Sequence, residues 1–165
     1  MQDLVQWLYN SWPSHMITDY RWSWPIAESL HFIGLGLMTG TVGAFDLRLL
    51  GFAKGVRPAD LHRLLRYGMI GFAISVVTGL WFITGAPEQY FYNHAFHFKV
   101  ATLVAIGLNV ALFYRYEFAG VLALGPGDDA PRRARIMAGL SLVLLAAVIL
   151  FGRMLTFFRP VSTNF

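Results

Sequence analysis

The sequence contains no cysteine, and only 13% of its 165 residues are charged. Without a thiol the chain can form neither a disulfide framework nor a thiolate metal site. Soluble domains carry about 25% charged residues, whereas this chain is 56% hydrophobic with a mean hydropathy of +0.53. The length permits one domain, and the composition indicates that it buries apolar surface in lipid.

Four stretches of the chain contain no charged residue, namely 29–45, 67–87, 100–114 and 136–152. With a few flanking residues, each reaches the ~20 residues that cross a bilayer core. We therefore predict helices near 24–50, 62–86, 93–116 and 132–157. The fold class expected is all-α, an integral membrane up-down four-helix bundle over 23–160, preceded by an aromatic interfacial segment over 1–22.

The basic residues predict how the chain is oriented. They gather in two loops, as Lys54, Arg57, Arg63 and Arg66 in one and Arg115, Arg132, Arg133 and Arg135 in the other. The 86–93 loop has no lysine or arginine. The positive-inside rule therefore places the two basic loops in the cytoplasm. We expect a multi-pass protein of the bacterial inner membrane with both termini periplasmic, and no nucleic-acid partner.

Two histidines lie at similar depths from the outer side. His31 follows Pro25 by six residues, or about 9 Å, and His97 follows the predicted cap Asn93 by four residues, or about 6 Å. In an up-down bundle the first and third helices are diagonal partners. Imidazoles are standard axial ligands of haem iron, so we expect His31 and His97 to hold one haem b between these helices.

Other polar residues of the outer half fit this site. Glu28 lies one turn before His31 and could fix its tautomer through a hydrogen bond. Lys99, Arg153 and His94 could meet the haem propionates, because intramembrane charges usually face the bundle interior. The function expected is electron transfer near the outer face, with a quinone or a periplasmic redox protein as partner and without a substrate reaction of its own.

The inner half holds a second polar set. Asp46 and Arg48 are expected to form a structural pair at the cytoplasmic boundary. A second haem there would use His62, with Met69 or Met137 as its other ligand.

Small residues indicate close helix contacts. Gly36-x-x-x-Gly40 and Gly68-x-x-Gly71 would let helices approach closely, within one chain or in a homo-oligomer.

Two segments carry a family resemblance: ESLHFIGLGLMTGTVGAFDLRLL and HAFHFKVATLVAIGLNVALFYR. They resemble small bacterial four-helix membrane proteins of unassigned function, and are similar to the membrane domain of copper-resistance protein D and to the HemJ protoporphyrinogen oxidase family. The shared pattern, within residues 25–160, is Leu30-His31, Arg48-Leu49 and His97-Phe98-Lys99. The HemJ-like resemblance implies that His31 and Lys99 are linked to haem b binding and activity.

Three alternatives to a haem electron-transfer protein stay open. A copper-handling protein could use an N/S site made of His31, Met38, His94, His97 and Met154. The resemblance also leaves a HemJ-like porphyrinogen oxidase, and a non-catalytic structural subunit of a membrane complex needs no cofactor.

Overall fold

The computed structural model describes residues 2–158, and this part of the chain contains helices but no strand. The helices are α1 (Gln2–Tyr9), α2 (Trp12–Thr18), α3 (Ser23–Leu49), α4 (Pro58–His62), α5 (Leu65–Gly85), α6 (Pro87–Phe91), α7 (His94–Tyr116), α8 (Phe118–Leu122) and α9 (Arg132–Met154). The all-α class is therefore confirmed. The last two residues of the predicted domain 23–160 lie outside the described range.

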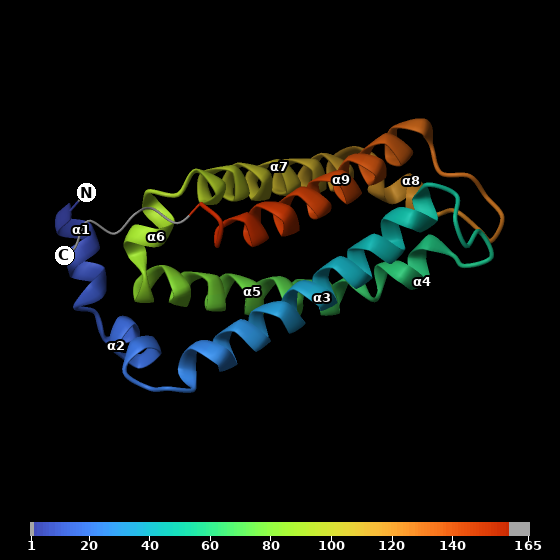
Figure 1. Cartoon of the computed structure of the whole chain (residues 1–165). Helices are drawn as coiled ribbons and strands as arrows, with labels where there is room; N and C mark the ends of the chain where they lie inside the picture. Colours follow the sequence, from blue (N-terminus) through green and yellow to red (C-terminus); the bar gives the residue numbers. More distant parts are fainter. Residues whose placement is uncertain (1, 159–165) are drawn as a thin grey trace.

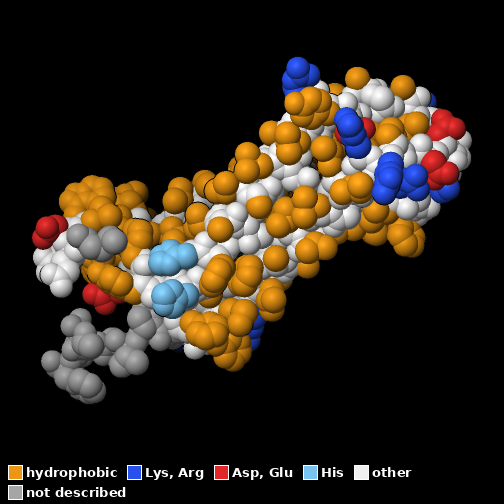
Figure 2. Space-filling view, turned by 90° about the horizontal axis from the view of Figure 1, so that it is seen from above, with side chains coloured by type: hydrophobic (Ala, Val, Ile, Leu, Met, Phe, Trp, Pro, Cys, Tyr) orange, Lys and Arg blue, Asp and Glu red, His pale blue; other side chains and the backbone are white. Residues whose placement is uncertain are grey.

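Four helical segments are long and apolar enough to cross a membrane: α3, α4 with α5, α7 and α9. Much of their surface is apolar and exposed, including Phe32, Val77, Leu108 and Val143, and Figure 2 shows hydrophobic side chains along the length of one face. Soluble proteins rarely expose such extensive apolar surface. The four segments therefore fit a multi-pass protein in a lipid bilayer.

The helices α3 and α5 run antiparallel in close contact (Figure 1). A Cβ atom added to Gly71 would overlap the Gly34 carbonyl oxygen, and one added to Gly34 would lie 2.7 Å from Oγ of Ser75. The absence of side chains at these positions lets the two backbones approach. The facing pairs along the interface are 41–68, 38–71, 34–75, 31–78 and 24–85. This register places residue 78 opposite residue 31.

The second pair consists of α7 and α9. Asn93 caps α7, as predicted, because its side chain accepts a hydrogen bond from the Ala95 amide at 2.9 Å. Two amide side chains tie α7 to α9, with Asn93 Nδ2 donating to the Leu155 carbonyl at 3.1 Å and Asn109 Nδ2 to the Met137 carbonyl at 3.0 Å. Amide hydrogen bonds of this kind help to fix helix pairs in lipid.

The two helix pairs share a hydrophobic core at one end of the molecule. Its buried members are Phe45, Leu49, Phe113, Val121, Ala130, Ala134 and Ala138. The loops at this end are tied together by an ion pair between Lys54 and Asp129, 2.7 Å apart. The hydrogen bond and the charge of Lys54 hold the pKa of the Asp129 carboxyl below its ordinary value. This end carries both of the basic loops.

The opposite end carries α1, α2 and α6 (Figure 1). Trp81 of α5 donates its indole N–H to the carbonyl of Pro13 in α2 at 2.8 Å. Ile17 is 2% exposed and lies so close to Gly85 that a Cβ atom there would be 2.6 Å away. The segment before α3 is therefore packed against the bundle, while Trp7 and Trp12 stay exposed.

Candidate functional site

His31 is the central polar residue of the half that lies away from the shared core. It projects from α3 toward α5, where its Nδ1 lies 2.8 Å from Oγ1 of Thr78. The ring also meets Phe82, with centroids 5.6 Å apart, and its Cε1 lies 3.6 Å from the place a Cβ would take on Gly79. The imidazole is half-buried, and glycine at 79 keeps the space beside it open.

The hydrogen bond to Thr78 fixes the tautomer of His31. The Thr78 hydroxyl donates its only proton to the Ile74 carbonyl at 2.7 Å within its own helix. Because this proton is used within α5, we infer that the hydroxyl accepts from His31, whose Nδ1 then carries the ring proton in the neutral imidazole. The lone pair is then on Nε2, which has no partner among the described residues. A histidine held in this way at one nitrogen is suited to bind a metal at the other.

A cation, Lys99 of α7, also lies toward this histidine. Its Nζ lies 3.7 Å from the place a Cβ would take on Gly152 of α9, so the side chain points toward α9. It is close enough to His31 for its charge to act on that ring. Within residues 2–158 it has neither a carboxylate nor a hydrogen-bond acceptor. Intramembrane charges without a partner are costly and mark functional sites.

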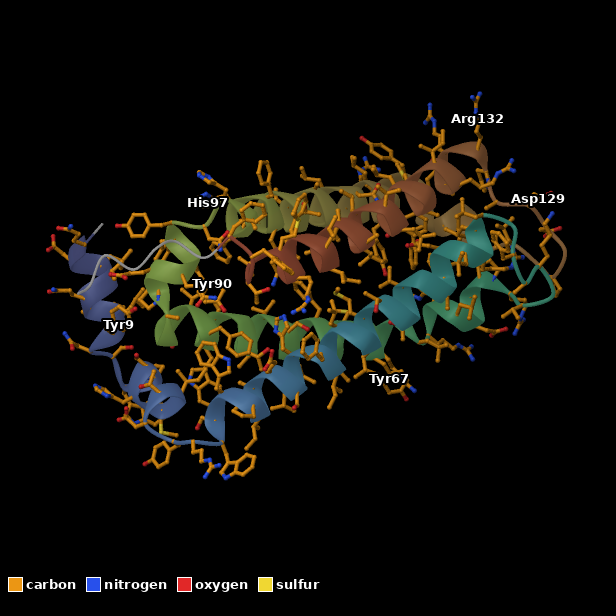
Figure 3. The ribbon with its side chains drawn as sticks, viewed as in Figure 1. Tyr9, Tyr67, Tyr90, His97, Asp129 and Arg132 are labelled. Carbon is orange, nitrogen blue, oxygen red and sulfur yellow. The ribbon has the colours of Figure 1, made fainter. Side chains whose placement is uncertain are left out.

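His97 does not face His31 in this structure, and the pairing of these two residues on one haem stays a prediction. Figure 3 shows His97 above α7, on the side turned away from α3 and α5. The side chain is exposed, and its ring neighbours are His94 and Phe96. Because Lys99 follows by two residues, which is about 200° around a helix, the two side chains point to opposite sides of α7.

Glu28 and Arg153 also lie elsewhere than expected. Glu28 is exposed and has no hydrogen bond or ion pair among the described residues, so Thr78 takes the role predicted for it. Arg153 is exposed, with its guanidinium 5.9 Å from the centre of the Phe157 ring. Three side chains were predicted to meet the haem propionates. Within residues 2–158, Lys99 is the one of these that lies toward His31.

The inner polar residues do not form the expected pair. Arg48 is 1% exposed and donates from Nε to the Val56 carbonyl at 2.5 Å, and from Nη2 to the carbonyls of Gly125 and Asp128 at 3.3 Å each. It therefore closes the loops instead of binding Asp46. The Asp46 carboxyl lies near Ser141 of α9 and has one oxygen, Oδ2, without a hydrogen bond.

His62 is also engaged by protein groups. Its Nε2 lies 2.9 Å from the hydroxyl of Tyr114, and its ring meets that of Phe118 at 4.8 Å. Met69 is 74% exposed. Nothing in this arrangement places a second ligand opposite His62.

No metal cluster accompanies these residues in the part of the chain that the structure describes. Within residues 2–158, no group of three or more His, Cys, Asp or Glu side chains is placed to hold a metal ion. An open apolar pocket lies between α2 and α5, lined by Trp12, Pro13, Met16, Val77, Leu80, Trp81 and Thr84.

Comparison with known proteins gives no family assignment. No family model, curated protein or solved structure matches this chain significantly. The candidate site therefore depends on its own geometry, with His31, Thr78 and Lys99 as the residues the structure brings together.

Proposed function

We propose that this protein binds haem b beside His31 and transfers electrons near the outer face of the bacterial inner membrane. In this proposal the four long helices form an up-down bundle with both termini periplasmic. The observation that carries it is the Nε2 of His31, which has no partner within residues 2–158, on a ring whose tautomer is set by the contact with Thr78. Bound haem would supply a one-electron Fe(III)/Fe(II) couple.

The residues present fit one axial ligand and one counter-charge. His31 offers an Nε2 that has no partner within residues 2–158, and Gly79 and Gly152 leave space beside the two polar side chains. Lys99 offers an ammonium without an ion-pair partner in the described part of the chain, and this charge would meet a propionate. His97 is not used in this proposal, because its ring faces away from the site.

The proximity of His31 and Lys99 also supports the HemJ-like alternative. These are the two positions that the resemblance links to haem binding and activity, and the charge of Lys99 acts on the His31 ring. A porphyrinogen oxidase would bind haem with the same residues and in addition act on a tetrapyrrole substrate. The open apolar pocket between α2 and α5 would suit the isoprenoid tail of a quinone, which either function could use as an electron acceptor.

The test is an absorption spectrum of the purified protein and of two histidine variants. We expect a Soret band in the wild type and a sharp alpha band after reduction. His31→Ala should lose these bands because it removes the iron ligand, whereas His97→Ala should keep them. Both variants should insert equally, since alanine is cheaper than histidine to place in lipid.

Three outcomes would contradict parts of the proposal. Loss of haem from His97→Ala would restore the pairing of His31 with His97 and require a rearrangement of α7. A colourless protein that keeps copper through dialysis would favour copper handling. A protein with neither cofactor would favour a structural subunit.

A further inference from the structure

The outer end of α7 carries two histidines that the proposed haem site does not use. His94 and His97 are separated by three residues, so they lie one turn apart on the same side of the helix. Both are exposed, and their ring centroids are 6.3 Å apart. Figure 2 shows two histidine side chains next to each other on the face viewed from above. The rings therefore form one exposed pair at the end of the molecule that carries α1, α2 and α6.

The ring nitrogens of both residues are available. Neither imidazole has a hydrogen bond or a carboxylate partner within the described part of the chain. The nearest lysine in sequence, Lys99, points to the other side of α7, toward Gly152. Both side chains are exposed, and changes at χ1 and χ2 can turn the rings toward one ion at about 2.0–2.1 Å from each nitrogen.

We propose that His94 and His97 form a two-imidazole binding site for Cu²⁺ at this exposed end of the protein. Imidazole suits copper, and Cu²⁺ has the highest affinity for nitrogen ligands among the divalent first-row metals. Two imidazoles on adjacent turns chelate one ion, and water completes the coordination. The helix dipole opposes a cation at this end, but at exposed positions it costs less than about tenfold in affinity.

This site is separate from the proposed haem site. It takes its ligands from the side of α7 opposite to Lys99, whereas His31 faces α5. Loss of the copper site should therefore leave the haem spectrum unchanged, and His31→Ala should leave Cu²⁺ binding unchanged. Each proposal can fail without the other.

The experiment is a Cu²⁺ titration of the full chain in detergent, followed by electron paramagnetic resonance. We expect one high-affinity Cu²⁺ per chain, with hyperfine splitting from two imidazole nitrogens. His94→Ala and His97→Ala should each reduce the pattern to one nitrogen. They should also weaken binding by about tenfold or more, since changes in groups that only support a ligand already cost 10–100-fold. Size-exclusion elution and helix content should match the wild type.

His15 provides the matched control. It is another exposed histidine, and its Nδ1 lies 3.3 Å from a carboxylate oxygen of Asp19, one turn later. His15 and Asp19 therefore offer a second pair of side chains that could chelate a metal ion. His15→Ala should leave both the affinity and the two-nitrogen spectrum intact. The proposal is overturned if the wild type has no two-nitrogen site, if either α7 variant keeps one, or if His15→Ala removes it.

Discussion

The Nδ1 atom of His31 and the Oγ1 atom of Thr78 lie 2.8 Å apart across the interface of α3 and α5. Since the threonine hydroxyl donates to the Ile74 carbonyl, this contact decides which nitrogen of the histidine carries the proton. The contact exists because small residues at 34 and 71 bring the two helices together in one register. A packing feature of the helix pair thus determines the chemistry available at Nε2.

The first prediction concerns that hydroxyl. Thr78→Val keeps the shape of the side chain but removes the acceptor for Nδ1–H, so the His31 ring loses its fixed tautomer. We expect haem to be retained 10–100-fold less tightly, which is the usual effect of losing a group that orients a metal-binding histidine. The rate of haem transfer to an excess of a haem-accepting protein measures this retention.

Thr102→Val is the matched control for this experiment. Thr102 is also a buried threonine, but its hydroxyl donates to the Phe98 carbonyl in its own helix and has no histidine partner. Equal haem transfer from the two variants would show that Thr78 does not support the ligand.

Much of the helical architecture was predictable from the sequence. Lipid requires long uncharged stretches, and the four observed spans begin and end within three residues of those expected, apart from the short helix α4 that precedes α5. Asn93 and the glycines at 68 and 71 had the expected roles as a cap and as points of close helix contact, whereas a Cβ atom at Gly36 or Gly40 would meet nothing within 4 Å in the described part of the chain. These features depend on local chemistry and on composition.

The rotation of each helix about its axis was not predictable in the same way. A helix that is apolar all around has no hydrophilic face to show which side turns inward. Residue spacing therefore predicted the depths of His31 and His97 along their helices. It did not predict the direction in which the His97 side chain points. The residue that indicates the direction of His97 is Lys99. An ammonium needs the bundle interior more than an imidazole at the lipid boundary does, so Lys99 takes the inward side of the helix and His97 the other side.

Thr78 and the actual partners of Arg48 were missed for a related reason. The register of α3 against α5 follows from which glycines face each other, and the sequence offers several possible pairings. Arg48 appeared to have a partner two residues away, but positions two apart on a helix point in different directions. Its partners are loop carbonyls near residues 56 and 125, which sequence spacing does not bring together.

The second prediction concerns the contact between α3 and α5. Gly71→Ala would force a methyl group onto the Gly34 carbonyl oxygen and close to the Met38 amide. Overpacking of this kind costs about 1–3 kcal/mol, and we expect the free energy of unfolding in mixed micelles to fall by that amount. The displacement of α5 relative to α3 should also disturb the contact between His31 and Thr78.

Gly36→Ala provides the comparison, because a Cβ atom at position 36 meets nothing within 4 Å. Alanine is a better helix former than glycine by about 1 kcal/mol, so this variant should be as stable as the wild type or slightly more stable. A larger loss of stability from Gly36→Ala than from Gly71→Ala would indicate that position 36 contacts another chain.

The third prediction concerns orientation in the membrane. Reporter fusions at Gly55 and Gly127 should read cytoplasmic, and a fusion at Gln89 should read periplasmic, because the lysines and arginines gather in the first and third loops between the long helices. The ion pair between Lys54 and Asp129 already places these two loops at one end of the molecule. A periplasmic signal at Gly55 would move the His31 site to the inner half of the membrane.

The last prediction concerns Lys99, which we expect to stabilise the reduced haem and to anchor a propionate. Lys99→Met keeps the length and apolar stem of the side chain but removes its charge. A positive charge near iron favours the Fe(II) state over the more positive Fe(III) state, so the variant should have a lower reduction potential. It should also lose haem faster, while its spectrum continues to show ligation by His31.

Arg153→Met is the control, because Arg153 is an exposed cation at the same end of the bundle, and its guanidinium lies over the Phe157 ring. A redox titration of both variants distinguishes the roles: equal potentials would remove Lys99 from the site, and a change of spin state in Lys99→Met alone would make its amine an iron ligand.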